Sequence, residues 1–488
     1  MNNKPLLSAI IIAAISFAVS AIITSCETIV SEPAPIELTD NSIATRSDVK
    51  GDWDEYNVTS SMAVAYAESF KDRTKIVSVE EYEYNGITCL YIINFEKGWM
   101  VIPADARVQP VLGDSEVENL YPEELENNGV IMWLDLSAKF VYYVKTQGRL
   151  EKEINPKVVA LWDGIKKGLS GSSAKSLEPG DDPAWVKVVT VNTTTTVDAN
   201  VPHLLETKWG QHYPWNTTLP FDPVILNLGY QQRFVTGCVP TAVSQVLYYF
   251  HNETGYPNDC WEQITPYISQ SLGGGQYKLG LNRVSTSYRI NSTHWDDMPL
   301  SQSDTGSFAH VSDLMMEVGV RMDATYSTNA TGASMISASE VAPCGLTANA
   351  YYYSYSTVKS NLLNDKPVLV SAFNNTNGHS WVIDGCFDRT VSTVTTVVYY
   401  EYQPGVLYPT GAIYLTEAEA LAECPGIYDG KTVITNNTVL TQYLLMNYGW
   451  DGQYDNGHYT IESTGSDWAS NYNQYINILY NLVAGQMY

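Results

Sequence analysis

Basic residues are scarce in this sequence. Lys and Arg together number 27 in 488 residues, against 53 Asp and Glu, so the formal net charge is −26. Proteins that bind nucleic acids need the opposite balance, because cationic side chains neutralise the phosphates. We therefore expect no nucleic-acid partner. A hydrophobic content of 44% with 12% aromatic residues predicts a packed globular protein, and the length favours two or three domains.

Cysteine is also sparse and scattered. The seven cysteines include no Cys-x-x-Cys pair and no tight cluster with histidine. This spacing argues against a zinc site and against a disulfide framework, and we expect neither a metal nor another cofactor. A disulfide among Cys260, Cys344, Cys386 and Cys424 stays open, because no spacing selects a pair.

The N-terminus carries a segment typical of export. Lys4 precedes an almost uninterrupted apolar run that ends in the sequence ITSC at Cys26. This ending resembles a bacterial lipobox, and we expect residues 1–26 to be a lipoprotein signal peptide that ends at a lipidated Cys26. Residues 27–50 have the polar, Pro-containing composition of a tether, so we expect the protein at the cell envelope. The alternative is a signal anchor, since the apolar run is nearly long enough to span a bilayer.

The rest of the chain divides at a segment of linker composition. Residues 169–200 are rich in Ser, Gly, Pro and Thr, and we expect them to be exposed and easily cut. Residues 51–168 predict a small α+β unit, and residues 201–488 are long enough for a domain with its own core. In the first unit, apolar spacing predicts helices over 60–70 and 131–143, with strands over 88–95 and 98–105.

A helix predicted in the second unit carries a reactive thiol at its start. In residues 236–250, TGCVPTAVSQVLYYF, apolar residues fall at 239, 242, 243, 246, 247 and 250, the spacing of one helical face. Cys238 stands at the N-terminal end, where the helix dipole and free backbone N–H groups favour a thiolate. Gly237 allows a tight turn there, and Pro240 fits the first turn. The alternative is a small buried hydrophobic residue, the usual fate of a cysteine.

Two further motifs supply partners for this thiol. The segment GHSWVIDG predicts a strand that opens with His379, and a thiol with a distant histidine is the constellation of a nucleophile and its base. Asn447, in the motif MNYGWDG, is suited to orient the imidazole, and Trp450 to cover that hydrogen bond. Considered alone, each of these three residues also has a purely structural explanation.

With these motifs the chain resembles the streptopain family of papain-like cysteine peptidases, the C10 family. The segments TGCVPTAVSQVLYY, GHSWVIDG and NYGWDGQYDNGHYT carry the resemblance. KWGQHYPWN at 208–216 resembles the entry to the mature enzyme, and GWMVIPADARVQPVLG in the first unit resembles the inhibitory propeptide. The resemblance implies an α+β fold with a papain-like, two-lobed catalytic domain. A helical part would carry Cys238, an antiparallel β part would carry His379, and a small α+β pro-domain would precede them.

The resemblance also implies the role of each site residue. Cys238 would be the nucleophile and His379 the general base and acid. Asn447 would orient the imidazole, and Trp450 would shield the pair from water. Gln211 would complete the oxyanion hole together with the backbone N–H of Cys238.

The resemblance also implies an activity. The chain would be the zymogen of a cysteine endopeptidase, an enzyme that cleaves proteins or peptides. Residues 51–168 would act as an intramolecular inhibitor, released by cleavage within 169–200. The catalytic domain would then begin near residue 201. A lipid on Cys26 would hold the precursor at the membrane until processing.

Two departures from the family pattern bear on this interpretation. Tyr448 stands where members often have a second tryptophan. Residues 387–440 form an insertion between His379 and Asn447, rich in strand-forming sequence with a helix-like TEAEALAE, and it can reshape the cleft. Two other functions stay open: a non-catalytic envelope module whose Tyr-rich surface binds glycan or peptide, and an amidase or transglutaminase that uses the same Cys–His pair on cell-wall peptides.

Overall fold

The computed structural model describes residues 53–485, with gaps at 71, 126–128, 149–153, 170–184, 256–263, 284–291, 374–377, 403–412, 415–421, 423–426 and 462–475. The expected signal peptide, lipobox and tether lie outside the described residues, as does nearly all of the helix-like TEAEALAE segment. Among the described helices, none has the length and apolar character needed to cross a bilayer.

The N-terminal unit, residues 53–169, is an antiparallel sheet with helices on both faces. Its sheet runs in the order β1-β2-β3-β4. Strand β2 alternates its side chains between two cores: Leu90 and Ile92 pack with α4, whereas Tyr91 and Ile93 pack with α3 and α5. The elements are α2 (Trp53–Tyr56), α3 (Ser60–Glu68), β1 (Ile76–Tyr84), β2 (Ile87–Phe95), β3 (Trp99–Pro103), β4 (Gly113–Ser115), the 3-10 helix η1 (Pro122–Glu124), α4 (Gly129–Gln147) and α5 (Pro156–Leu169).

The second unit has a helical part and a β part. In the helical part, α7 packs against α9 and β10, and its apolar face lies in a core with Trp209, Trp215 and Trp295. The helices and their hairpin are α6 (Pro223–Asn227), α7 (Cys238–Thr254), β6 (Ile264–Gly273), β7 (Gln276–Arg283), α8 (Ser292–Asp296), α9 (Phe308–Arg321), α10 (Ala338–Val341), η3 (Ala342–Cys344) and α11 (Tyr355–Leu362).

The β part is a sheet of long and short strands in the order β13-β12-β10-β9-β14-β8, with β5 beside β10. Apart from the two-residue β11, its neighbouring strands pair antiparallel. The strands are β5 (Trp185–Val201), β8 (Leu346–Tyr352), β9 (Val368–Phe373), β10 (Gly378–Tyr402), β11 (Ile413–Tyr414), β12 (Ile427–Asn447), β13 (His458–Tyr459) and β14 (Ile476–Ala484).

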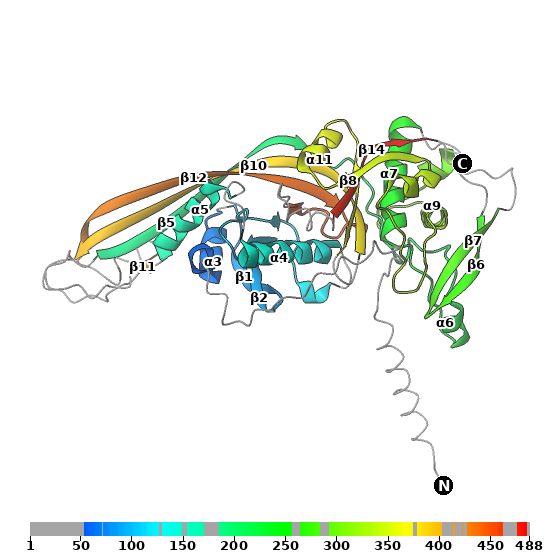
Figure 1. Cartoon of the computed structure of the whole chain (residues 1–488), viewed down its shortest axis with the longest axis horizontal. Coiled ribbons are helices and arrows are strands. Elements are labelled where there is room, and N and C mark those ends of the chain that lie inside the picture. Colours follow the sequence, from blue (N-terminus) through cyan, green and yellow to red (C-terminus); the bar gives the residue numbers. More distant parts are fainter. Residues whose placement is uncertain are drawn as a thin grey trace, which may run out of the picture.

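Strand β5 and the outer parts of β10 and β12 form a three-stranded ribbon that extends beyond α5 (Figure 1). The expected β-rich insertion is therefore a long hairpin joined by a third strand. That third strand corrects the C-terminal half of the linker expected over 169–200, because Trp185–Val201 pairs with β10 along its whole length, whereas residues 170–184 lie outside the described residues. The composition was misleading here, since its Thr and Val residues are β-branched and favour strands.

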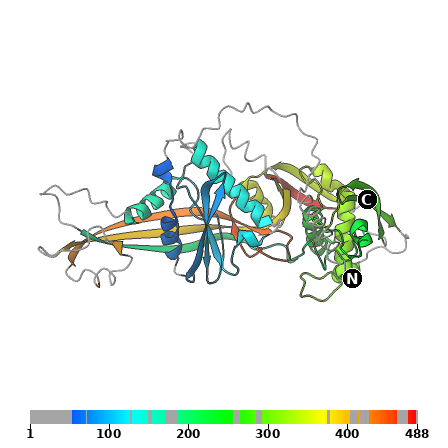
Figure 2. The ribbon, with the colours of Figure 1, turned by 90° about the horizontal axis from the view of Figure 1, so that it is seen from below.

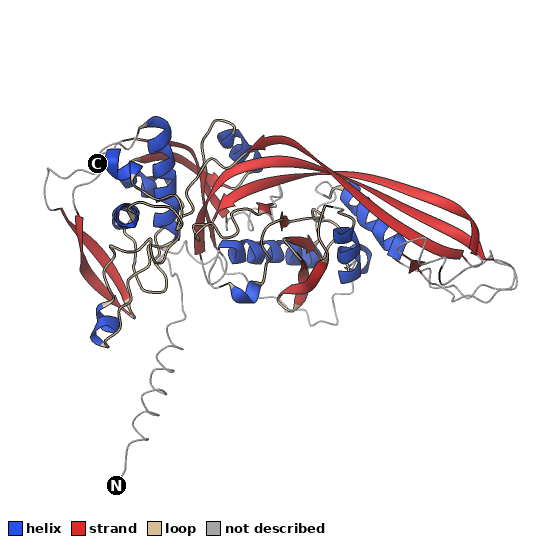
Figure 3. Cartoon of the chain, turned by 180° about the vertical axis from the view of Figure 1, so that it is seen from behind, coloured by secondary structure: helices blue, strands red, loops and turns tan. Residues whose placement is uncertain are grey.

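The ribbon and the N-terminal unit are packed together. Val391 and Val439 on one face of the ribbon share a core with Tyr66 of α3 and Trp162 of α5. Seen from below, the N-terminal unit lies across the ribbon while the helical part occupies the other end of the molecule (Figure 2). The short strands of the N-terminal unit lie below the long ribbon in Figure 3, and they belong to the same hydrogen-bonded sheet because β4 pairs with β13.

Candidate active site

Cys238 is the first residue of α7, as expected from the sequence. The residue before it, Gly237, has φ 93°, and a Cβ there would collide with the backbone oxygen of Thr331. Only glycine fits this turn. The side chain of Cys238 is 8% exposed and belongs to the core beneath α7. The fold therefore holds the thiol at a helix N-terminus, where backbone N–H groups favour an anion.

Gln211 lies beside the segment that leads into Cys238. Its backbone oxygen accepts hydrogen bonds from the backbone N (3.1 Å) and Oγ1 (3.3 Å) of Thr236, two residues before the thiol. The side chain is buried, and among the described residues its Nε2 has no hydrogen-bond partner. Leaving a buried N–H unsatisfied costs about 1–3 kcal/mol, so this amide is a candidate donor to a bound acceptor.

His379 lies at the beginning of β10 and is 6% exposed. Its Nε2 lies 3.2 Å from the backbone oxygen of Tyr448. Because a carbonyl only accepts, the proton is on Nε2 in this contact. Burial lowers the pKa of His379 to about 4, although the hydrogen bond to Tyr448 works in the opposite direction. The imidazole is therefore neutral near pH 7.

Asn447 is buried, but its side chain does not reach His379. Its Oδ1 accepts hydrogen bonds from Gln245 Nε2 (3.0 Å) and the backbone N of Gly449 (3.1 Å), and its Nδ2 donates to the oxygen of Thr207 (2.6 Å). In this structure the imidazole is held by the main chain of the next residue, Tyr448, and Asn447 ties the end of β12 to α7.

The ring that stacks on His379 is Trp381. The two ring centroids are 6.0 Å apart at an interplanar angle of 19°. Trp450, expected as the shield, instead has its ring 5.9 Å from that of His212, and its Nε1 is buried without a partner. The sequence did carry a signal for Trp381, because residues two apart on a strand lie on the same face.

A glycine of the N-terminal unit lies directly against His379. A Cβ at Gly129, the first residue of α4, would lie 2.8 Å from His379 Nε2 and would also collide with the ring of Tyr448. Val130 of the same helix packs in one core with Trp381 and Tyr448. The start of α4 therefore covers the imidazole, and no sequence pattern predicts this contact between distant segments.

Acidic residues support the main chain behind His379. Asp455 accepts a hydrogen bond from the backbone N of Tyr448 (3.1 Å), and burial raises its pKa to about 8. Nearby, Asp384 accepts from His203 Nδ1 (2.9 Å) and the backbone N of Leu205 (3.1 Å). These contacts tie the chain entering the second unit to the strand that carries His379.

The described cysteines other than Cys238 are buried and form no disulfide. Cys89, Cys344 and Cys386 carry free thiols, whereas Cys260 and Cys424 lie outside the described residues. Burial raises the pKa of Cys89 to about 11 and that of Cys344 to about 12. Their thiols therefore stay protonated and unreactive near neutral pH.

A sequence profile of the Peptidase C10 family matches residues 209–459, a little over half of the chain. The chain belongs to the Peptidase C10 family. Its α+β fold is thereby confirmed, with a papain-like catalytic domain in which a helical part carries Cys238 and an antiparallel part carries His379. A C10 peptidase is a cysteine-type hydrolase that acts on proteins or peptides.

Among solved structures, this C10 peptidase is similar to a fragment of prointerpain A from Prevotella intermedia, residues 39–359 in a cysteine-to-alanine variant. The two share 18% sequence identity with a TM-score of 0.44, and the alignment covers 84% of this chain and 100% of that one. A search among curated proteins finds no match.

Proposed function

We propose that this chain is the zymogen of a cysteine endopeptidase, with Cys238 as nucleophile and His379 as general base and acid. The observation that carries the proposal is the position of Gly129 against the imidazole of His379. A substrate cannot occupy the space beside His379 while α4 begins there. Residues 51–168 therefore serve as the inhibitory pro-domain of the domain at 201–488.

In the reaction, the Cys238 thiolate attacks the carbonyl carbon of the scissile peptide bond and forms a C–S bond. The imidazolium of His379 gives its proton to the leaving nitrogen as the C–N bond breaks. Water, deprotonated by His379, then attacks the thioester carbonyl carbon. The C–S bond breaks, the acyl group leaves as the carboxylic acid product, and the thiolate of Cys238 with the imidazolium of His379 is restored. The backbone N–H of Cys238 and the unpartnered Nε2 of Gln211 stabilise the oxyanion, a contribution worth ~10²–10³ in rate for one such donor.

The docked pro-domain inhibits in a second way, through protonation. The reactive pair needs an imidazolium, yet burial holds the pKa of His379 near 4 in the precursor. Departure of α4 exposes the ring, and its pKa returns toward the ordinary value of about 6.5. Asn447 and Trp450 reach their expected positions beside His379 only if the departure of α4 allows their side chains to reorient.

Processing of the purified precursor tests this function. Cys238→Ala should abolish casein hydrolysis and leave the full-length chain intact on incubation, whereas Cys344→Ala, at a buried thiol, should process and hydrolyse normally. An epoxide thiol inhibitor should label Cys238 alone in the processed wild type. Self-processing by the Cys238→Ala protein would refute the proposal, and release of muropeptides without casein hydrolysis would favour a cell-wall amidase.

The same incubation locates the maturation cut. A protease needs an unpaired, extended substrate, and β5 is paired with β10 from Trp185 to Val201. We expect mass spectrometry to find the new N-terminus at or before Trp185, so that the mature enzyme keeps β5. A new N-terminus inside 186–201 would show that the ribbon opens before processing.

We further propose that the precursor is exported and anchored at the envelope by a lipid on Cys26. The lipobox-like ITSC sequence and the tether composition of residues 27–50 support this location. The wild-type precursor should partition with the membrane fraction and Cys26→Ser should not. Equal partitioning of the two proteins would exclude the lipid anchor.

A further inference from the structure

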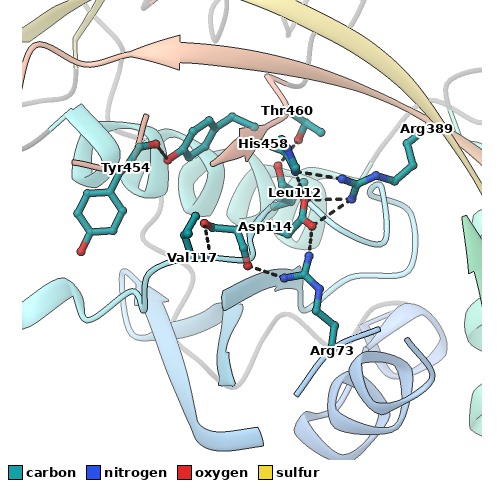
Figure 4. Close-up of polar contacts among 10 residues, drawn as sticks. Arg73, Leu112, Asp114, Val117, Arg389, Tyr454, His458 and Thr460 are labelled. Carbon is teal, nitrogen blue, oxygen red and sulfur yellow. Dashed lines mark hydrogen bonds and ion pairs between the residues drawn. The ribbon is translucent and has the colours of Figure 1, made fainter. Parts of the chain in front are cut away.

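One buried carboxylate joins the N-terminal unit to the catalytic domain through an ion cluster (Figure 4). Asp114 of β4 is fully buried and accepts from Arg389 Nη1 at 3.0 and 3.1 Å. Nδ1 of His458 lies 3.2 Å from Asp114 and 3.0 Å from Arg389, and Arg73 pairs with the other side of the carboxylate. Burial alone would raise the pKa of Asp114, but the three neighbours hold it well below its usual range.

The charges divide unequally between the two units. Arg389 and His458 belong to the catalytic domain, and Arg389 is 12% exposed, with its guanidinium 4.6 Å from the ring centroid of Tyr443. The carboxylates that act on Arg389 are Asp114 and Glu116, both from the N-terminal unit. A cavity of about 270 Å³ opens beside the cluster. Removal of the N-terminal unit would therefore take away the carboxylate that pairs with Arg389 and open its guanidinium to a new partner, while the ring of Tyr443 stays beside it.

Asp114 arrives on a strand that extends the catalytic sheet. β4 pairs antiparallel with β13, with Asp114 opposite His458, and the oxygen of Leu112 accepts from the backbone N (2.8 Å) and Oγ1 (2.9 Å) of Thr460. Before Asp114, a Cβ at Gly113 would lie 2.9 Å from the backbone oxygen of His458. The edge thus receives an extended Gly-Asp segment, with main-chain hydrogen bonds for affinity and a side-chain pocket for selectivity.

We propose that, in the mature enzyme, the β13 edge with Arg389 and His458 is a docking site for an extended acidic segment of a protein substrate. This inference rests on the proposed zymogen function, because the N-terminal unit must leave first. In the precursor, β4 occupies the site as the substrate segment would. β13 pairs with β12 at Leu444 and Leu445, close in sequence to Tyr448, which holds His379. A segment docked there joins the sheet whose strand β12 leads directly to Tyr448.

Synthetic peptides of residues 110–118 test the site on the processed enzyme, blocked at its thiol by an epoxide. The wild-type peptide should bind at least roughly tenfold more tightly than an Asp114→Asn peptide, the scale of one charge-assisted pair. Arg389→Gln enzyme should lose this preference. Lys359→Gln, which removes a cation that pairs with Asp388 instead, should keep it.

A second measurement needs no processing and so separates failure of this site from failure of the zymogen function. In the full chain, Asp114→Ala vacates the carboxylate position. Acetate should raise the melting temperature of this variant in a concentration-dependent way, but not that of an Asp114→Ala/Arg389→Gln double variant.

Each of three results would overturn the proposal. The first is equal binding of the two peptides to the wild-type enzyme, and the second is a retained preference in the Arg389→Gln enzyme. The third is an equal effect of acetate on the melting temperatures of the two proteins that carry Asp114→Ala. Persistent binding of the cleaved N-terminal unit, displaced by neither peptide, would show that the edge serves inhibition alone.

Discussion

The imidazole of His379 is covered at one point by a residue without a side chain. Gly129 fits because it has no Cβ, and any larger residue meets both His379 and the ring of Tyr448. At the scale of single residues, this contact thus depends on the missing side chain of Gly129. Gln211 shows the converse, since its Nε2 is present and buried but has no hydrogen-bond partner among the described residues.

Gly129→Ala should weaken docking of the N-terminal unit. The added methyl group overfills a packed contact, which costs about 1–3 kcal/mol, so self-processing and inhibitor labelling of Cys238 should both accelerate. The rates can be followed by gel electrophoresis and mass spectrometry. Gln147→Ala, at the exposed end of the same helix, is the matched control and should behave as wild type. Slower processing of Gly129→Ala would contradict the assigned contact.

The protonation of His379 should change with maturation. Its pKa of about 4 in the precursor lies below the ordinary value of about 6.5, so the covered ring binds fewer protons. Between these two pH values acid favours the state in which the ring is exposed, and below pH 4 the effect saturates. NMR titration of the imidazole, assigned by comparison with His379→Gln, should give the low pKa before processing and a higher one after it. An unchanged pKa would mean that the ring stays buried.

At the scale of elements, apolar periodicity in the sequence predicts the helices and strands whose formation depends on neighbouring residues. Helices α3, α4 and α7 and strands β2 and β3 appear where apolar periodicity predicted them, and α7 begins at Cys238. Sequence patterns do not predict strand β5, because its partners lie 185 (386 − 201) to 216 (401 − 185) residues away and its Thr-rich composition is also typical of a linker. The same limit applies to the site. The motifs located the thiol and the imidazole, but the contacts of His379 with Trp381, Tyr448 and Gly129 depend on packing between distant segments.

The ribbon offers a matched pair of neighbours on opposite faces. Val439 is buried against the N-terminal unit, whereas Leu440 is 48% exposed. Val439→Asp should destabilise the precursor by about 3–5 kcal/mol, because it buries an uncompensated charge. Leu440→Asp should stay within about 0.5 kcal/mol of wild type. Thermal unfolding of the precursor provides the measurement, and equal losses in both variants would mean that the ribbon faces are wrongly assigned.

At the scale of the whole molecule, the two units contribute strands to one sheet, which has 12 strands over the described ranges. Among the described residues, the N-terminal unit contacts the catalytic domain at several places, including α4 on His379, α3 and α5 on the ribbon, and β4 on β13. Cleavage of the connecting chain breaks none of these contacts. In the proposed zymogen function, cutting and release are therefore separate steps, and release uncovers the imidazole of His379.

Strand β10 runs without interruption from Gly378, beside the imidazole, to Tyr402 in the ribbon. Successive side chains of a strand point to opposite faces, so removal of one residue from the ribbon would turn every more distal side chain to the wrong side. Removal of two residues from each of β5, β10 and β12 would keep the faces and leave the base of β10 where it is. Lengths of this ribbon among relatives should therefore differ in steps of two residues per strand, while the distance along the chain from His379 to the first ribbon residue stays constant.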